Sequence, residues 1–183
     1  MKHFNLQFFT FSPDTDESRK GGEEIECFIK RVAVEKARKV FEDFSNIPDK
    51  SIILAGDTLV LLDGKILGKP KDIEEARTMI QQLSGTTHQV STAYAILDGF
   101  NGDELVELVS TQVTFRDLDH SLVEWYLGLG EGLDKAGAYS IQGYGTYLVT
   151  GIEGSYKNVV GFPIEQVLEI LLKKGWISLS SKN

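Results

Sequence analysis

The stretch IILAGDTLVLLDGKILGKP, residues 52–70, decides how the middle of this chain folds. It opens on an apolar run, 52–55, that is too short for a helix and rich in branched residues, which predicts a buried strand. A second apolar run covers 59–62, and Gly56 and Asp57 stand between the two runs. Asp63-Gly64 before residues 65–67 is the strongest short signal for a hairpin turn. The stretch therefore predicts strand segments around a carboxylate, followed by a tight hairpin.

Asp57 has two interpretations at this point. An ionised aspartate inside apolar strand sequence costs several kcal/mol unless a lysine or a metal ion pairs with it. The alternative is an aspartate in a polar turn at the end of a strand. The stretch closes on Gly68-Lys69-Pro70, a lysine between a flexible and a rigid residue. The stretch alone leaves both interpretations open.

The N-terminal side predicts a strand, a loop and a helix. Residues 4–11 alternate in hydrophobicity, which favours a strand, and residues 12–17 form a polar loop that carries three acids. Residues 23–44 place apolar side chains at helical spacing, so this segment predicts the clearest helix of the chain. Lys36 falls on the edge of the apolar stripe. Its ammonium either reaches past the stripe to solvent or lines a cleft and meets an anion there.

The C-terminal side predicts helices around an antiparallel strand pair. Asp72 suits the N-cap of a helix at 72–84, with Glu75 completing a capping box. Residues 88–98 and 104–116 predict two long strands, and the turn residues between them make the pair antiparallel. A short helix is expected at 121–127, a strand at 147–149, and a final helix from Pro163 to Gly175.

Composition excludes several classes of function. With 42% hydrophobic and 25% charged residues, the 183-residue chain has the profile of an ordinary soluble globular protein. A net charge of −8 argues against binding nucleic acid over the whole surface. No window of about 18 apolar residues and no signal peptide is visible, so we expect a cytoplasmic protein without a membrane partner. Cys27 is the only cysteine, which excludes an intrachain disulfide and suits a reducing compartment.

Lysines and acids together indicate phosphate chemistry. Three lysines lie in structured or turn-rich places with acids close by in sequence: Lys36, Lys69 and Lys135, with Glu17, Asp57 and Asp134. Hydrolysis of a polyphosphate needs lysines that neutralise the phosphate oxygens and a divalent metal, held by carboxylates, that activates water. The Walker A and GxGxxG patterns are absent, and the histidines lack a nucleophile elbow. We interpret His88 as a residue at the start of a strand. The residues alone thus reach an anion- or phosphate-handling cleft.

Six segments, in order over about residues 4–172, give this sequence a resemblance to a known family: VEKA (34–37), LAGDTLV (54–60), GKP (68–70), LSGTTHQVSTA (83–93), LDKAGAYSIQG (133–143) and EGSYKNVVGFP (153–163). The chain resembles the Maf family of nucleoside triphosphate pyrophosphatases. The resemblance implies one Maf-like domain over residues 1–183. It implies a mixed α/β fold, similar to that of the inosine triphosphate pyrophosphatases: an elongated sheet flanked by helices, with two lobes and a central cleft.

The resemblance also implies an activity and a site. The activity is hydrolysis of a nucleoside triphosphate to the monophosphate and pyrophosphate, with Mg²⁺ or Mn²⁺, by a cytoplasmic and often homodimeric enzyme. By position, Asp57 matches the catalytic carboxylate, which also holds the metal. Lys36 and Lys69 match triphosphate-binding lysines, Gln142 matches a glutamine near the metal or base, and Glu17 matches a substrate- and metal-binding acid. The pairing of AGDT with IQG resembles the subfamily that acts on dTTP and UTP.

One departure from the family pattern bears on activity. Family members begin with a strand and a Ser-x-Ser-Pro-Arg-Arg loop whose arginines contact the triphosphate. Here Ser12-Pro13 is followed by Asp14. Either the sequence is shortened, or this member is impaired, or another chain supplies the loop. A catalytically impaired nucleotide-binding or protein-interaction protein of the same fold is therefore the alternative to an active enzyme, and a third interpretation treats the lysines and acids as surface charge alone.

Overall fold

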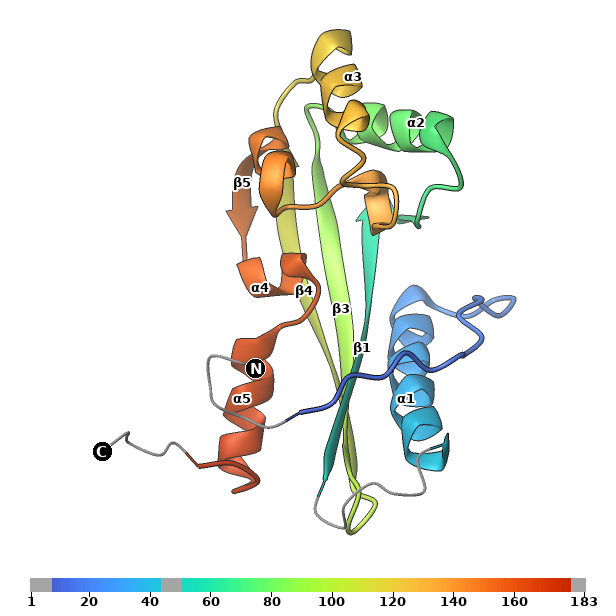
Figure 1. Cartoon of the computed structure of the whole chain (residues 1–183), viewed down its shortest axis with the longest axis vertical. Helices are drawn as coiled ribbons and strands as arrows, with labels where there is room; N and C mark the ends of the chain where they lie inside the picture. Colours follow the sequence, from blue (N-terminus) through green and yellow to red (C-terminus); the bar gives the residue numbers. More distant parts are fainter. Residues whose placement is uncertain (1–7, 44–50, 179–183) are drawn as a thin grey trace. The chain divides into compact units, whose positions relative to one another are not determined.

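The computed structural model describes residues 8–43 and 51–178. The helices and strands follow in the order α1 (Ile25–Asp43), β1 (Ile52–Leu62), β2 (Lys65–Leu67), α2 (Ile73–Leu83), β3 (Thr87–Asp98), β4 (Glu104–Phe115), α3 (His120–Gly128), β5 (Val149–Glu153), α4 (Tyr156–Val160) and α5 (Ile164–Lys173), with short 3₁₀ helices η2 (Ala136–Ala138) and η3 (Gly143–Leu148) before β5. The strands form one sheet in the order β2-β1-β3-β4-β5 (Figure 1). The mixed α/β class expected from the sequence is confirmed. None of the described helices has the length and apolar character needed to cross a membrane.

The chain divides into two compact units. The first comprises Met1–Gly56, Ala93–Glu107 and Pro163–Asn183, and the second comprises Asp57–Thr92 and Leu108–Phe162. Strands β1, β3 and β4 therefore contribute residues to both units.

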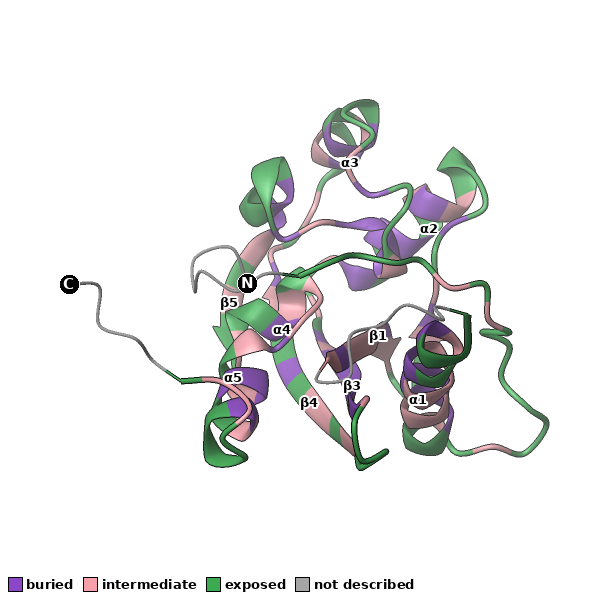
Figure 2. Ribbon diagram, turned by 60° about the horizontal axis from the view of Figure 1, so that its bottom comes forward, coloured by how far each residue is buried: buried purple, intermediate pink, exposed green. Residues whose placement is uncertain are grey.

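In the first unit, α1 and α5 lie on either side of the strands (Figure 1). The apolar stripe predicted for the first helix is the buried face of α1, which includes Phe28, Val32 and Ala37. Figure 2 shows this buried face alternating with exposed residues along the helix. Arg38 on the outer face of α1 donates two hydrogen bonds, of 2.8 and 3.1 Å, to the carboxylate of Glu104 on β4. The helix is thus held by apolar burial on one side and by an ion pair at its rim.

In the second unit, α2 and α3 pack against each other and close the apolar core. That core includes Val60 of β1, Ile80 of α2, Phe115 of β4 and Ile141. Every residue of β3 from Val90 to Asp98 is buried, because β3 is the middle strand of the sheet and has a neighbouring strand on each side. Both predicted strands of the β3–β4 pair are confirmed, and the short connection between these sheet neighbours permits only an antiparallel arrangement.

Local chemistry explains the turn and the cap. Asp63 and Gly64 have φ angles of 50° and 74°, as a two-residue hairpin turn of this hand requires, and β1 pairs antiparallel with β2 from Val60 opposite Leu67. The Asp72 carboxylate accepts a 2.8 Å hydrogen bond from the Glu75 amide at the start of α2. The predicted hairpin and N-cap are confirmed.

Two predictions about local structure are wrong, and one open question about Asp57 is answered. Residues 8–11 form no strand, and residues 4–7 lie outside the described residues; Phe9 is 81% exposed, so alternation here is not matched by burial. The expected strand at 147–149 begins only at Val149, because residues 143–148 form η3. Of the two interpretations of Asp57, the one inside a strand holds, because both apolar runs of the 52–70 stretch belong to the single strand β1. Pairing within the sheet outweighs the weak strand propensity of Gly56 and Asp57.

Candidate active site

The structure assigns the five predicted site residues to the two units. Glu17 and Lys36 belong to the first unit. Asp57, Lys69 and Gln142 belong to the second: Asp57 lies inside β1, Lys69 follows β2, and Gln142 precedes η3. Each group has its own supporting contacts.

In the first unit, the loop before α1 is tied to the helix at two points. Lys36 Nζ lies 2.7 Å from Glu17 Oε1, and the Lys36 side chain is only 15% exposed. Arg31 donates to both carboxylate oxygens of Glu23, at 2.8 and 2.9 Å, and to the Ser18 carbonyl at 3.0 Å. The hydrogen bonds from Arg31 lower the pKa of Glu23 to about 2. Two residues that the sequence placed in one site, Glu17 and Lys36, are therefore direct partners.

In the second unit, Asp57 is half-buried in the middle of β1 rather than at a strand end. Side chains alternate along a strand, so Asp57 and Leu59 point to one face while Thr58 and Val60 point to the other. Val60 belongs to the apolar core of the second unit. The core thus holds the strand from one face and leaves the Asp57 carboxylate on the opposite face.

A polar network fixes the strand next to Asp57. Thr58 Oγ1 lies 2.8 Å from Thr92 Oγ1 on β3 and 3.3 Å from the Gly161 carbonyl. Thr92 Oγ1 in turn donates a long hydrogen bond, 3.4 Å, to the carbonyl of Asn158 in α4. These side-chain hydrogen bonds link β1 and β3, which are neighbours in the sheet, to the segment around α4.

Asn158 is the centre of this network and is completely buried. Its Nδ2 donates to the Val90 carbonyl and to Thr111 Oγ1, both at 2.9 Å. The Val90 carbonyl can only accept, so the side-chain NH₂ must face it. Thr111 Oγ1 also accepts from the Ser155 amide at 3.1 Å and donates to the Ser155 carbonyl at 3.2 Å. One asparagine therefore connects β3, β4 and α4.

The Lys69 loop is clipped to the segment that contains Lys135. The Gly137 amide donates a 3.0 Å hydrogen bond to the Gly68 carbonyl. Gly137 has φ +71°, and a Cβ there would lie 3.1 Å from the Val60 side chain, so this close approach requires glycine. Lys135 forms an ion pair with Asp134. The hydrogen bond from Lys135 lowers the pKa of Asp134, and the charge of Lys69 adds to this effect.

His88 is a structural residue, as its sequence position indicated. It lies in β3, is 2% exposed, and its Nε2 is 2.8 Å from the Tyr139 hydroxyl. Its ring packs edge-on against Phe115 and Tyr139, with centroids 5.0 and 5.4 Å apart. Burial lowers the pKa of His88 to about 4, so the ring is neutral near pH 7. The contact holds Tyr139 three residues before Gln142.

The carboxylates have the right chemistry for a hard divalent cation. Mg²⁺ usually takes one or two protein carboxylates and completes its shell with water and substrate oxygens. Asp57 offers such oxygens from a strand, whereas Glu17 Oε1 already meets Lys36. The described residues contain no group of three or more histidine, cysteine, aspartate or glutamate side chains able to hold a metal by themselves. A metal here would depend on few protein ligands and on substrate oxygens.

Comparison with known proteins identifies the family of this chain. The family described as Maf-like protein matches residues 1–174. The chain belongs to the Maf family. Proteins named dTTP/UTP pyrophosphatase are 44% identical over 175 residues in Myxococcus xanthus, covering 96% of this chain and 86% of that protein, and 45% identical over 165 residues in an Anaeromyxobacter species, covering 88% and 77%. A third, from Pyrococcus furiosus, is 51% identical over 134 residues, 73% of this chain and 68% of the other.

Sequence reasoning missed the hydrogen-bond network next to Asp57. In the sequence, Thr111 is a polar residue that interrupts the apolar side chains of one strand face. A polar residue at a buried strand position needs a hydrogen-bond partner, and that was the available signal. The partner itself, Asn158, is 47 residues away in sequence and could not be found from periodicity.

Replacing Asn158 by alanine should lower the free energy of unfolding by about 2–4 kcal/mol, because the buried Val90 carbonyl and Thr111 hydroxyl lose their donor. Urea denaturation followed by circular dichroism measures this. Asn101→Ala is the matched control, since Asn101 is exposed in a turn and should cost less than about 1 kcal/mol. Equal losses for the two variants would show that the network contributes nothing.

His88 should make stability fall on mild acidification. The unfolded chain binds a proton near pH 6.5, whereas folded His88 binds it near pH 4, so the unfolded state holds more protons between these values. Stability is full above about pH 6.5, and about 2 kcal/mol is lost by pH 5. Urea denaturation at pH 7.5 and 5.0 measures the difference. His88→Gln should remove most of it, whereas His120→Gln, at an exposed position, should not; an unchanged pH dependence in His88→Gln contradicts the assignment.

Proposed function

We propose that this Maf-family chain hydrolyses dTTP and UTP between the α and β phosphates, giving the nucleoside monophosphate and pyrophosphate. The observation that carries the proposal is the extent of the match to proteins named dTTP/UTP pyrophosphatase, 44% identity over 96% of the chain in one case. The position of Asp57 supports it, because a carboxylate held on a fixed strand is what metal-assisted phosphate chemistry needs.

The proposed roles follow from the chemistry of each side chain. Asp57 binds the divalent metal, Mg²⁺ or Mn²⁺, and orients the attacking water. When bound, the metal withdraws charge from the phosphate oxygens and lowers the pKa of a bound water. Lys69 and Lys36 neutralise phosphate oxygens, and each such charge-assisted hydrogen bond is worth about 1.5–3 kcal/mol.

Glu17 and Gln142 complete the proposed set. Glu17 keeps the Lys36 ammonium in place at 2.7 Å and supplies a further carboxylate for metal or substrate. Gln142 is exposed at the N-terminus of η3, where its amide can both donate to and accept from a nucleotide. We further propose one functional domain over residues 1–183, a cytoplasmic location and a homodimer, on the strength of the family resemblance.

Replacing Asp57 by asparagine should reduce turnover of UTP and dTTP by at least a hundredfold, because the side chain keeps its shape and loses the charge that holds the metal. Release of pyrophosphate in the presence of Mg²⁺ or Mn²⁺ measures this. Asp63→Asn makes the same change in the turn that ends β1, where asparagine tolerates the positive φ, and should leave turnover within about twofold.

The outcomes separate the alternatives. Turnover that is lost only in Asp57→Asn supports the proposal. Equal turnover of Asp57→Asn and the wild type removes Asp57 from the mechanism. Calorimetric binding of UTP to the wild type without any hydrolysis favours a nucleotide-binding protein that lacks catalysis.

A further inference from the structure

The loop that carries Gln142 is anchored symmetrically on both sides. Two residues before Gln142, the Ser140 amide donates a 3.0 Å hydrogen bond to the Tyr126 hydroxyl of α3. Two residues after it, the Tyr144 amide donates a 3.0 Å hydrogen bond to Glu131 Oε2, and the Gly145 amide reaches the same oxygen at 3.3 Å. The side chain of Gln142 is exposed between these two anchors.

Glu131 fits the start of η3 closely. A carboxylate at the N-terminus of a helix satisfies amides that have no partner within the helix. Gly143 has φ +68°, and a Cβ there would lie 2.6 Å from Glu131 Oε1, so the carboxylate packs directly against the turn after Gln142. A Cβ on Gly145 would lie 1.9 Å from the Ser140 carbonyl, so the loop folds back tightly on itself. Glu131 therefore holds a turn that glycines alone make sterically possible.

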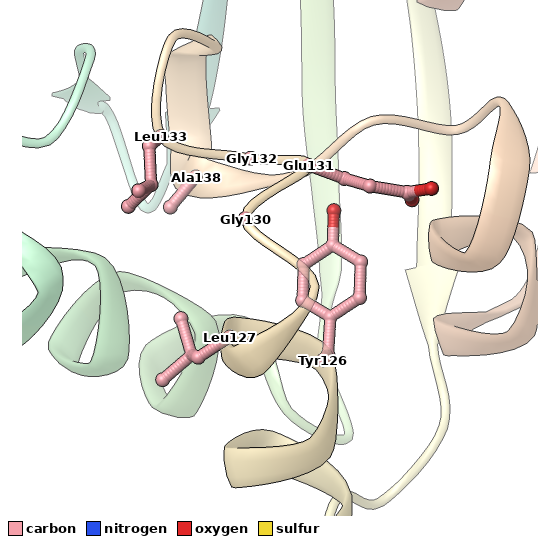
Figure 3. A pocket seen from close by; sticks show the side chains of 7 residues that line it. All are labelled: Tyr126, Leu127, Gly130, Glu131, Gly132, Leu133 and Ala138. Carbon is pink, nitrogen blue, oxygen red and sulfur yellow. The ribbon is translucent and has the colours of Figure 1, made fainter.

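Tyr126 supplies the other anchor. It is 1% exposed, and burial raises the pKa of its phenol to about 12, so the hydroxyl is neutral near pH 7. Figure 3 shows the hydroxyl end of Tyr126 directed toward the Glu131 side chain. Both anchors thus come from one short segment of chain, 126–131, at and just beyond the end of α3.

These anchors do not form a nucleotide pocket themselves. Together with Leu127, Gly130, Gly132, Leu133 and Ala138 they line a shallow hollow with no enclosed room even for a water molecule (Figure 3). Pockets for ligands of nucleotide size have about 300–1,000 Å³. Glu131 and Tyr126 are therefore better suited to hold the loop than to bind substrate.

We propose that Glu131 is a positioning residue: with Tyr126, it fixes the 140–145 turn so that Gln142 presents its amide to the nucleotide. This inference rests on the proposed function, because it assigns Gln142 a contact with substrate. Fixing the turn before substrate arrives removes the cost of ordering it during catalysis. Glu131 itself takes no part in the chemical step.

A double-mutant cycle tests the link between Glu131 and Gln142. Glu131→Ala and Gln142→Ala should each lower kcat for UTP by about 10- to 100-fold, and the double variant should be no worse than Gln142→Ala alone. Glu131→Gln, which keeps an acceptor oxygen, should recover part of the loss. Asp119→Ala removes a comparable cap, at the start of α3, and should destabilise the protein similarly without changing kcat. Additive effects of Glu131→Ala and Gln142→Ala would overturn the proposal.

Hydrogen exchange provides a readout that does not need turnover. In ¹⁵N NMR spectra, the amides of Tyr144 and Gly145 should exchange at least tenfold faster in Glu131→Ala, and the Gln142 side-chain resonances should shift. Tyr126→Phe should accelerate exchange of the Ser140 amide instead. Unchanged exchange and unchanged Gln142 resonances would overturn the positioning role. If the variants show these exchange changes but the wild-type protein does not hydrolyse UTP, the proposed function is overturned. The anchoring of the loop by Glu131 and Tyr126 is then still established.

Discussion

The hydrogen bonds around Asn158 are the constraint on which the second unit depends. One buried side chain donates to β3 through the Val90 carbonyl and to β4 through the Thr111 hydroxyl, and its own backbone carbonyl accepts from Thr92. Each of these groups would be costly to bury alone, so none keeps its place unless the others are present. The network makes α4 and three strands of the sheet a single cooperative piece.

The same network gives Asp57 a fixed setting. Thr58, its neighbour in β1, ends the chain of contacts at Thr92 and Gly161. Because strand side chains alternate, fixing the Thr58 hydroxyl on one face determines where the Asp57 carboxylate lies on the other. The GKP loop is then joined to the LDKAGA segment by the hydrogen bond between Gly137 and Gly68. Ordinary structural contacts thus prepare the groups proposed to handle phosphate.

The parts of the fold that could be predicted are those with local causes. Helical spacing identified α1, the Asp72 carboxylate marked the start of α2, and Asp63-Gly64 gave the hairpin. The predictions failed where contacts distant in sequence decide the outcome. At residues 143–148, η3 replaces an expected strand where Glu131 takes the amides of Tyr144 and Gly145. The choice that the sequence left open for Asp57 is likewise decided by its place in the sheet.

For the candidate site, the sequence suggested residues and roles, whereas the contacts that support those residues came only from the structure. Family segments indicated Asp57, Lys36, Lys69, Gln142 and Glu17, and their roles remain proposals. The structure adds the direct pairing of Glu17 with Lys36, which spacing alone did not reveal because a loop must fold back onto α1 to make it. The side-chain contacts of Asn158, Glu131 and Tyr126 stayed hidden for the same reason, since their partners lie 13 to 68 residues away in sequence.

The central proposal is that this chain uses water to cleave a nucleoside triphosphate between its α and β phosphates. The most direct test is to incubate the protein with UTP and a divalent metal in ¹⁸O-labelled water and to follow the products by ³¹P NMR and mass spectrometry. We expect UMP and pyrophosphate as the products, with one ¹⁸O atom in one of the two; the labelled product identifies the phosphorus that water attacks. Formation of UDP and orthophosphate would contradict the proposal.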